Sequence, residues 1–101
     1  MLRGTLTKVS WSNPHGWIDL DVTGPDRKVV AWRVETNAPN AMFRRGWRKS
    51  DLVPGTAVVV EGLLARDGRP AVHATRITLA DGRVLFSDEP TDGNYGLRRR
   101  R

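Results

Sequence analysis

Cysteine is absent from this chain of 101 residues. Its absence excludes disulfide bonds, thiolate metal sites and a cysteine nucleophile, and it leaves the redox compartment open. Long apolar runs are also missing, because no stretch approaches the roughly 18 apolar residues that a transmembrane helix needs. No apolar segment typical of a secretory signal follows Met1, so we expect the chain as given to be cytosolic or already processed.

The sequence also lacks the motifs of the common enzyme classes. It contains no G-x-S-x-G, no H-E-x-x-H and no phosphate-binding loop. Asp19 and Asp21 share one strand face about 7 Å apart, but like charges on an exposed face are common. We therefore predict a protein that is not an enzyme, with no catalytic residues and no cofactor.

The composition that remains is that of a folded, basic domain. Hydrophobic residues form 39% of the chain and charged residues 28%, which is typical of soluble proteins, and the length suits one domain with a single core. Lys and Arg number 17 against 11 Asp and Glu, so the net charge is +6. Residues 88–101 contain four of the arginines and three of the acids, so most of the excess charge belongs to the domain body.

Short segments with β-strand patterns, separated by turn residues, occupy most of the chain. Residues 17–22 alternate strictly, with apolar side chains on one face and aspartates on the other. The pairs Asp67-Gly68 and Asp81-Gly82 predict tight hairpin turns, and Gly62 predicts a bulge or bend. We predict strands over residues 3–11, 17–22, 28–35, 56–64, 70–80 and 83–86, with Thr75, Ile77 and Leu79 facing inward on the fifth.

Residues 37–46 interrupt the strand pattern and predict a short helix, begun by Asn37 or Asn40 and ended by Gly46. Three strands, a helix and then further strands are the chain order of an OB-fold. We predict an all-β fold, a small closed or partly open OB-like barrel of five to six strands with one short helix between strands three and four. An SH3-like barrel or an open sandwich is the alternative. The barrel domain covers residues 1–86, and a polar tail covers 87–101.

The turn that contains His15 is the first candidate site. In OB barrels this loop borders the usual binding face, and Trp11, Asn13 and Trp17 surround His15 here. One interpretation is a metal ligand or an aromatic-walled pocket, since imidazole binds transition metals and tryptophan stacks on rings or cations. The alternative is a structural turn whose tryptophans cover a barrel end. A second ligand from His73 requires the fifth strand to lie beside this loop.

A basic cluster around the predicted helix is the second candidate site. It contains Arg44, Arg45, Trp47 and Arg48. Basic residues neutralise phosphates while an aromatic ring stacks on a base, so the cluster favours nucleic-acid binding. A solvated surface is the alternative interpretation. We predict that the aromatic residues of this region belong to the core and its lid, namely Trp32, Phe43 and Trp47.

The tail is the third candidate site. It would be a solubilising segment, an anchor on an acidic surface or an assembly arm. Tyr95 and Leu97 are the apolar residues through which it would dock on a protein partner. The last four residues would add charge to that contact: Arg98, Arg99, Arg100 and Arg101.

An ordered series of motifs resembles that of one family of small exported proteins of Gram-negative bacteria, a domain of unknown function, over roughly residues 3–86. The motifs are Trp11-Ser12-Asn13-Pro14-His15, Arg44-Arg45-Gly46-Trp47, Leu52-Val53-Pro54-Gly55, Ala65-Arg66-Asp67-Gly68 and Leu79-Ala80-Asp81-Gly82-Arg83. The resemblance implies a periplasmic β-barrel with no assigned cofactor and no activity to carry over. The export signal and the short His-containing segment usual in that family are absent here, and the arginine-ended tail is unusual.

Three hypotheses follow for function. The first is a non-enzymatic, exported binding or assembly module that contacts a protein partner or itself through the tail. The second is a basic OB-fold protein that binds nucleic acid. The third is a periplasmic protein that binds a metal through His15.

Overall fold

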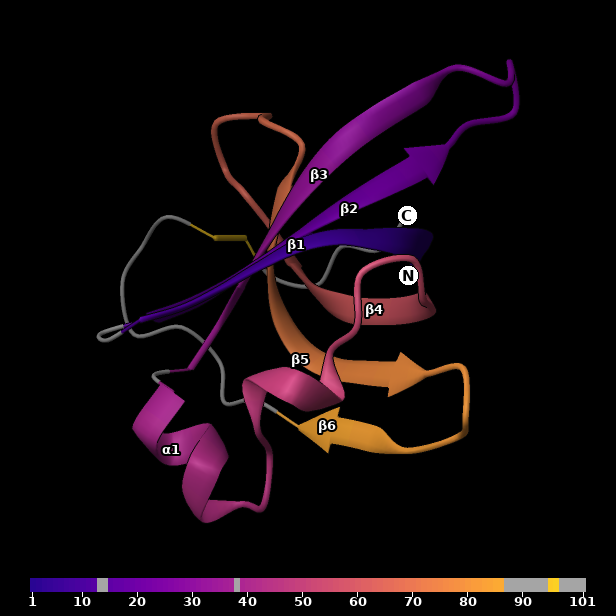
Figure 1. The fold of residues 1–101 in the computed structure, drawn as a ribbon. Coiled ribbons are helices and arrows are strands. Elements are labelled where there is room, and N and C mark those ends of the chain that lie inside the picture. Colours follow the sequence, from indigo (N-terminus) through magenta and orange to yellow (C-terminus); the bar gives the residue numbers. More distant parts are fainter. Residues whose placement is uncertain (13–14, 38, 87–94, 97–101) are drawn as a thin grey trace.

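Alternating apolar residues build six strands in the part of the chain that this computed structural model describes, residues 1–12, 15–37, 39–86 and 95–96 (Figure 1). The strands and helices follow the predicted order closely. They are β1 (Leu2–Ser12), β2 (His15–Thr23), β3 (Val29–Thr36), α1 (Pro39–Arg44), the 3-10 turn η1 (Lys49–Asp51), β4 (Ala57–Leu64), β5 (Ala71–Leu79) and β6 (Val84–Phe86).

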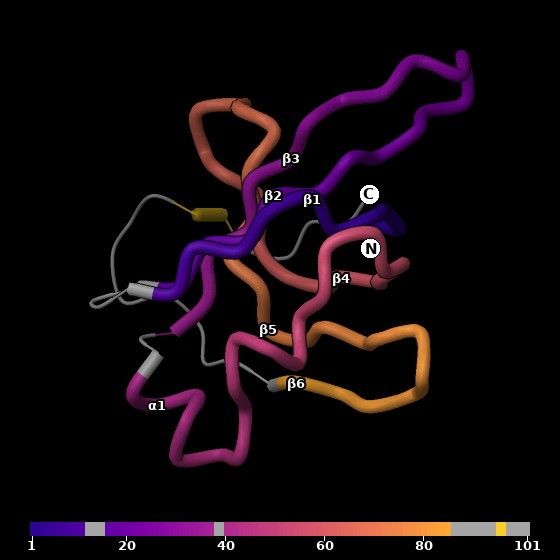
Figure 2. Tube along the Cα trace, viewed as in Figure 1, coloured from indigo at the N-terminus to yellow at the C-terminus, as the bar shows by residue number. Residues whose placement is uncertain are grey.

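The strands close into a barrel. Their order is β3-β2-β1-β4-β5-β6, and β3 pairs additionally with β5, so five strands form a ring while β6 extends β5 at the outside (Figure 2). The closing pair is parallel, with Val34 opposite Val72, whereas the other pairs are antiparallel. Closure removes most of the exposed sheet edges that would promote aggregation. The predicted small barrel with a short helix between the third and fourth strands is confirmed.

Apolar side chains fill the interior of the barrel. Leu20, Val34 and Met42 are completely buried in one cluster with inward residues from β1, β4, β5 and β6. Burial of each large aliphatic side chain stabilises the fold by about 1.5–3 kcal/mol. Met42 comes from α1, so its side chain anchors the helix against the barrel core.

A β-bulge interrupts the pairing between β4 and β5, as the glycine at position 62 indicated. The register shifts between Glu61 and Gly62, and a Cβ at Gly62 would collide with the carbonyl oxygen of His73. The extra residue is Thr75, whose Oγ1 donates a hydrogen bond to the Glu61 carbonyl at 3.2 Å. Ile77 and Leu79 face inward as predicted, but the prediction for Thr75 was wrong, because the bulge makes the inward series of β5 Val72, Ala74, Ile77 and Leu79.

The β2–β3 hairpin extends well beyond the closed ring (Figure 1). Its strands remain paired as far as Thr23 opposite Val29. The Gly24 amide donates to the Lys28 carbonyl at 2.9 Å, and Arg27 adopts a positive φ of 67° to complete the turn. The hairpin is therefore a paired ribbon up to its tip, although no barrel lies beneath its outer half.

Candidate functional site

The outer face of β2 and β3 carries the first aromatic group. Even-numbered residues of β2 face the core, so Trp17 and Asp19 point outward, next to Arg33 of β3. The Arg33 guanidinium lies 4.5 Å from the centre of the Trp17 ring and 3.6 Å, through Nε, from Oδ1 of Asp19. Both the ring and the carboxylate thus interact with the same cation, and Arg33 already occupies one face of the Trp17 ring.

Trp11 does not share that face. It lies on the core side of β1, opposite Gly16, where it packs against the core as a partly buried side chain. A Cβ at Gly16 would lie 3.3 Å from the Trp11 ring, so glycine allows this close approach. Trp11 and Trp17 therefore line opposite faces of the sheet. Of the other residues of this site, Asn13 lies outside the described residues, and His15 is described only as backbone, in β2 opposite Ser12.

His73 lies under the returning end of the chain, away from the β1–β2 turn. It is 3% exposed, and the ring of Tyr95 meets it edge to face at 5.6 Å. Tyr95 forms a β-bridge with Ala65, and the Gly96 amide donates to the Leu64 carbonyl at 2.6 Å. Tyr95 thus docks on the barrel of its own chain, while Leu97 and the arginines from 98 to 101 lie outside the described residues.

The topology separates the two histidines. Gly16 of β2 pairs with Thr36 of β3, and Glu35 of β3 pairs with His73 of β5, so β3 lies between the strands of His15 and His73. Within the described residues no group of three or more His, Asp or Glu side chains is placed to hold a metal ion.

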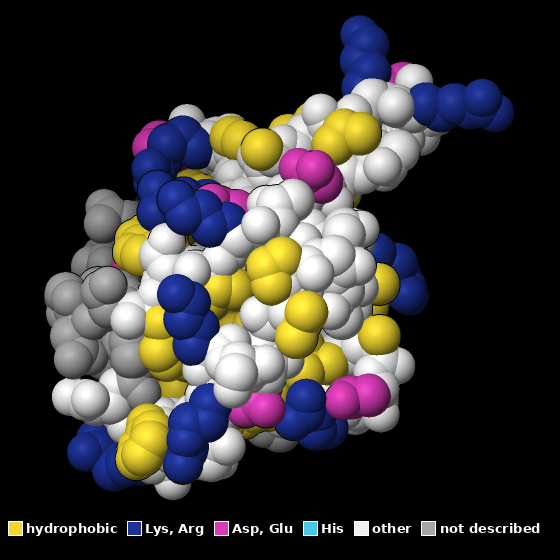
Figure 3. All heavy atoms as spheres, viewed as in Figure 1, with side chains coloured by type: hydrophobic (Ala, Val, Ile, Leu, Met, Phe, Trp, Pro, Cys, Tyr) yellow, Lys and Arg dark blue, Asp and Glu magenta, His cyan; other side chains and the backbone are white. Residues whose placement is uncertain are grey.

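The segment of α1 and η1 carries a second group, the basic–aromatic surface, defined here as Phe43, Arg44, Arg45, Trp47 and Arg48. Phe43 is 56% exposed, and the Arg48 guanidinium lies 3.9 Å from the centre of its ring. Trp47 packs partly against the core, with the Arg83 guanidinium 5.4 Å from its ring centre. The space-filling view shows an apolar side chain between Lys or Arg side chains over this part of the molecule (Figure 3).

Arg83 connects this surface to the barrel. Its Nη1 lies 3.2 Å from Oδ1 of Asp51, and its Nε lies 2.8 Å from Oδ2 of Asp81. The Arg48 amide donates to Oδ2 of Asp51 at 2.8 Å. Two hydrogen bonds hold the pKa of the Asp51 carboxyl below its ordinary value. The larger contribution comes from the backbone amide of Arg48, and the next from the side chain of Arg83. The η1 turn and the β5–β6 turn are therefore joined by charged groups at the solvent-exposed surface.

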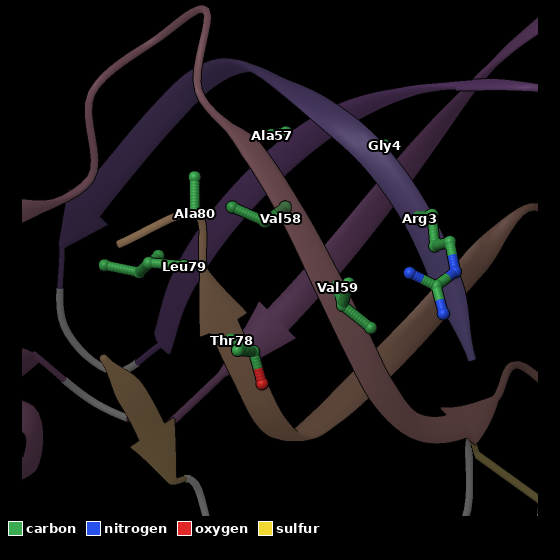
Figure 4. Close-up of a pocket in the computed structure, with 8 residues that line it drawn as sticks. All are labelled: Arg3, Gly4, Ala57, Val58, Val59, Thr78, Leu79 and Ala80. Carbon is green, nitrogen blue, oxygen red and sulfur yellow. The ribbon is translucent and has the colours of Figure 1, made fainter. Parts of the chain in front are cut away.

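Two hollows of similar volume differ in their lining residues. One, of about 300 Å³, is lined by residues that include Arg45, Trp47 and Arg83. Another, of about 290 Å³, lies over β1, β4 and β5, where Arg3 is the one charged lining residue among apolar neighbours and Thr78 (Figure 4). The first combines cations with an aromatic wall, whereas the second has no convergent polar groups, so only the first resembles a binding site.

Residues 1–74 match the model of a family described as a family of unknown function, DUF6152. The chain belongs to DUF6152. No curated protein and no solved structure matched the chain. No helix among the described residues is long and apolar enough to cross a membrane.

The DUF6152 match includes the outer face of β2 and β3 and the basic–aromatic surface, but it ends before Arg83 and Tyr95. The structure brings together the predicted residues Arg44, Arg45, Trp47 and Arg48 on one short segment. The prediction that Trp32 and Trp47 contribute to the core agrees with their burial, whereas Phe43 is an exposed ring.

Sequence reasoning missed two contributors to this surface. Phe43 was predicted to belong to the core and its lid, but its ring is 56% exposed while Met42 is completely buried, because adjacent residues of a helix point in different directions. Arg83 was predicted only as the first residue of the last strand. Its position directly after Asp81-Gly82 was the available signal, because the turn aims it at the aspartate that precedes it.

Proposed function

We propose that this protein is a non-enzymatic binding module that holds an anionic partner on its basic–aromatic surface. The observation that carries the proposal is the exposed ring of Phe43 under the Arg48 guanidinium, beside the exposed side chains of Arg44 and Arg45. The interior of the barrel is filled by side chains, so a partner meets the outside of the molecule.

The chemistry of this surface supports an anionic partner. Guanidinium groups bind carboxylates and phosphates through paired hydrogen bonds, and they stack on aromatic rings. Arg83 is already paired with two aspartates, but no salt bridge joins Arg44 or Arg48 to an acid among the described residues. Arg44 would therefore meet an incoming anion without first releasing an acidic neighbour among the described residues.

A nucleic acid is the second candidate, because the exposed Phe43 ring gives the same surface a stacking platform for a base. The two candidates differ in salt dependence. Binding of a single strand through about three phosphates would weaken roughly twentyfold between about 50 and 200 mM salt. An acidic protein partner would bind with a weaker salt dependence and would not require the ring.

The test compares two double variants that remove equal charge. Arg44→Gln with Arg45→Gln changes the basic–aromatic surface, and Lys8→Gln with Arg66→Gln removes the same charge from exposed positions elsewhere, on β1 and after β4. Fluorescence anisotropy would follow a labelled single-stranded oligonucleotide and a labelled polyglutamate peptide. We expect about tenfold weaker binding for the first variant and nearly unchanged binding for the second. Equal weakening by both variants would show that only the net charge matters and would contradict the proposal.

We also propose, on the motif resemblance to an exported family, that the protein works in the periplasm. Fractionation of the native organism by osmotic shock tests this location against a cytosolic and a periplasmic marker. Recovery wholly with the cytosolic marker would contradict it. The metal-binding hypothesis for His15 stays a prediction.

A further inference from the structure

The outer half of the β2–β3 hairpin has an open strand edge. β3 pairs with β5 only from Arg33 to Glu35, so the preceding residues, 29–32, pair with β2 on one side and with no described strand on the other. An open edge presents backbone amide and carbonyl groups that can pair with another chain.

The direction of the backbone groups follows from two hydrogen bonds. Lys28 accepts from Gly24 across the hairpin, whereas the Arg33 amide donates away from β2, to the Pro70 carbonyl at 3.0 Å. In an antiparallel pair, successive residues alternate between bonding the neighbour and facing away from it. Val29 and Ala31 therefore direct their amides and carbonyls to the open edge, in the same direction as Arg33.

A hollow lies beneath the same edge. It has a volume of about 550 Å³ and lies between the start of β1 and the hairpin, with Val30 and Trp32 among its lining residues. Val30 is 44% exposed, and Met1, which also lines the hollow, is 40% exposed. A side chain entering this hollow would cover apolar surface that the fold leaves in water.

The charges around the edge are mainly positive. Among the described residues, Arg3, Arg27 and Lys28 form no salt bridge with an acid, and all three are exposed. Asp26 is used by the turn, where its carboxylate accepts the Lys28 amide at 3.0 Å. Asp21 lies on the opposite face of the hairpin from the hollow. The edge therefore complements an acidic partner.

We propose that this edge binds an extended, acidic and apolar peptide segment of another protein, which adds to β3 as a further strand. In an antiparallel arrangement, polar residues of the peptide pair with Val29 and Ala31. The residues opposite Val30 and Trp32 are apolar and enter the hollow, and the residue opposite Lys28 is acidic. From its N-terminus, the peptide therefore reads apolar, polar, apolar, polar, acidic, with the first residue opposite Trp32 and the last opposite Lys28.

A second copy of this chain is a poorer occupant. The antiparallel self-pairing that uses all of the open groups places Val29 of one copy opposite Ala31 of the other. It then places Arg27 of each copy opposite Arg33 of its partner, and directly opposed like charges destabilise a strand pair. The Arg33 amide is also already bonded to Pro70.

The test uses a labelled peptide with the core Val-Thr-Val-Thr-Glu and a control with Lys in place of Glu. We expect the Glu peptide to bind about fivefold to tenfold more tightly to the unchanged protein. Lys28→Glu should reverse this preference. NMR chemical shifts should change at the amides of Val29 and Ala31, and not on α1.

Ala31→Pro tests the added strand directly. It removes an amide that faces the open edge and leaves the bonds to β2 intact, so we expect at least about tenfold weaker binding by a folded variant. Ala31→Val keeps the amide and should bind as the unchanged protein does. The Arg44→Gln, Arg45→Gln double variant should also bind the peptide normally, which separates this proposal from the function proposed above.

Several results would overturn the inference. They are equal binding of the two peptides, full binding by folded Ala31→Pro, and no binding by either peptide at millimolar concentration. Concentration-dependent dimers in sedimentation that Ala31→Pro abolishes would identify a second copy as the occupant and would also overturn it. If Ala31→Pro fails to fold, the reversal of preference by Lys28→Glu still decides the question.

Discussion

The α1–η1 segment and the outer half of the β2–β3 hairpin both lie outside the closed ring, and they are held in different ways. The α1–η1 segment inserts Met42 into the core and joins the β5–β6 turn through Arg83 and its two aspartates. The outer half of the β2–β3 hairpin relies on its own ladder and turn, and its cations lack acidic partners among the described residues. A small barrel can thus present one surface on a segment that is fixed to the core and another on a hairpin that is held only by its own strand pairing and turn.

The largest expected effect on stability comes from truncating Met42, the side chain that holds the α1–η1 segment against the core. Met42 is completely buried, so Met42→Ala should lower the free energy of unfolding by about 2–4 kcal/mol. The matched change on the ribbon, Val30→Ala, should cost less than about 1 kcal/mol because Val30 is already half in water. Urea denaturation of both variants measures the difference. Equal losses would show that the hairpin contributes to the core as much as the helix does.

Amide hydrogen exchange should sharpen the same comparison within β3. The amides of Val29 and Ala31 face the open edge, whereas those of Val30 and Trp32 bond to β2. We expect the first two to exchange at least about tenfold faster than the second two. Two-dimensional NMR after transfer to heavy water measures these rates. Uniform protection along residues 29–32 would mean that the edge is covered.

The smallest expected effect on stability concerns the ion pair between Asp51 and Arg83. Because the pKa of Asp51 is lower in the folded protein than its ordinary value of 3.8, its carboxylate stabilises the fold above that pH. This contribution is lost as the pH falls through the folded pKa. Asp51→Asn should therefore be slightly less stable than the unchanged protein at neutral pH, with a difference that disappears in acid. Thermal unfolding of both proteins between neutral and acidic pH checks this sign.

A pH-independent difference would indicate that Asp51 acts through its hydrogen-bond geometry and not through its charge. Lys8→Gln is a suitable control, because it removes one charge from a side chain with no salt bridge among the described residues. Its stability should follow that of the unchanged protein at every pH.

Local patterns predicted most of the strands. The alternation in β2, the Asp-Gly turns and the glycine at the bulge each depend on the conformational preferences of a few neighbouring residues. Thr75 was misplaced because the bulge adds one residue to β5 and reverses the faces of the strand beyond it. Gly62 signalled that bulge, but not which of the two strands receives the extra residue.

The candidate sites were less predictable than the strands. Arg44, Arg45 and Arg48 are neighbours in sequence, so their common location followed from the sequence itself. The contacts of Arg83 with Asp51 and Trp47 join segments about 30 residues apart, and no local pattern indicates them. Trp11 and Trp17 looked like two walls of one pocket, but strand alternation places them on opposite faces.

By itself, the sequence determined the basic charge, the absence of cysteine chemistry, the order of strands and helix, and the turns between them. These properties depend on residue types and short-range backbone preferences. The tertiary structure decided which strands close the ring, that Phe43 is exposed while Met42 is buried, and that Tyr95 returns to its own barrel. It also decided that residues 29–32 pair with β2 alone among the described strands. These properties depend on which distant segments meet, because closure and burial are set by the packing of the whole chain.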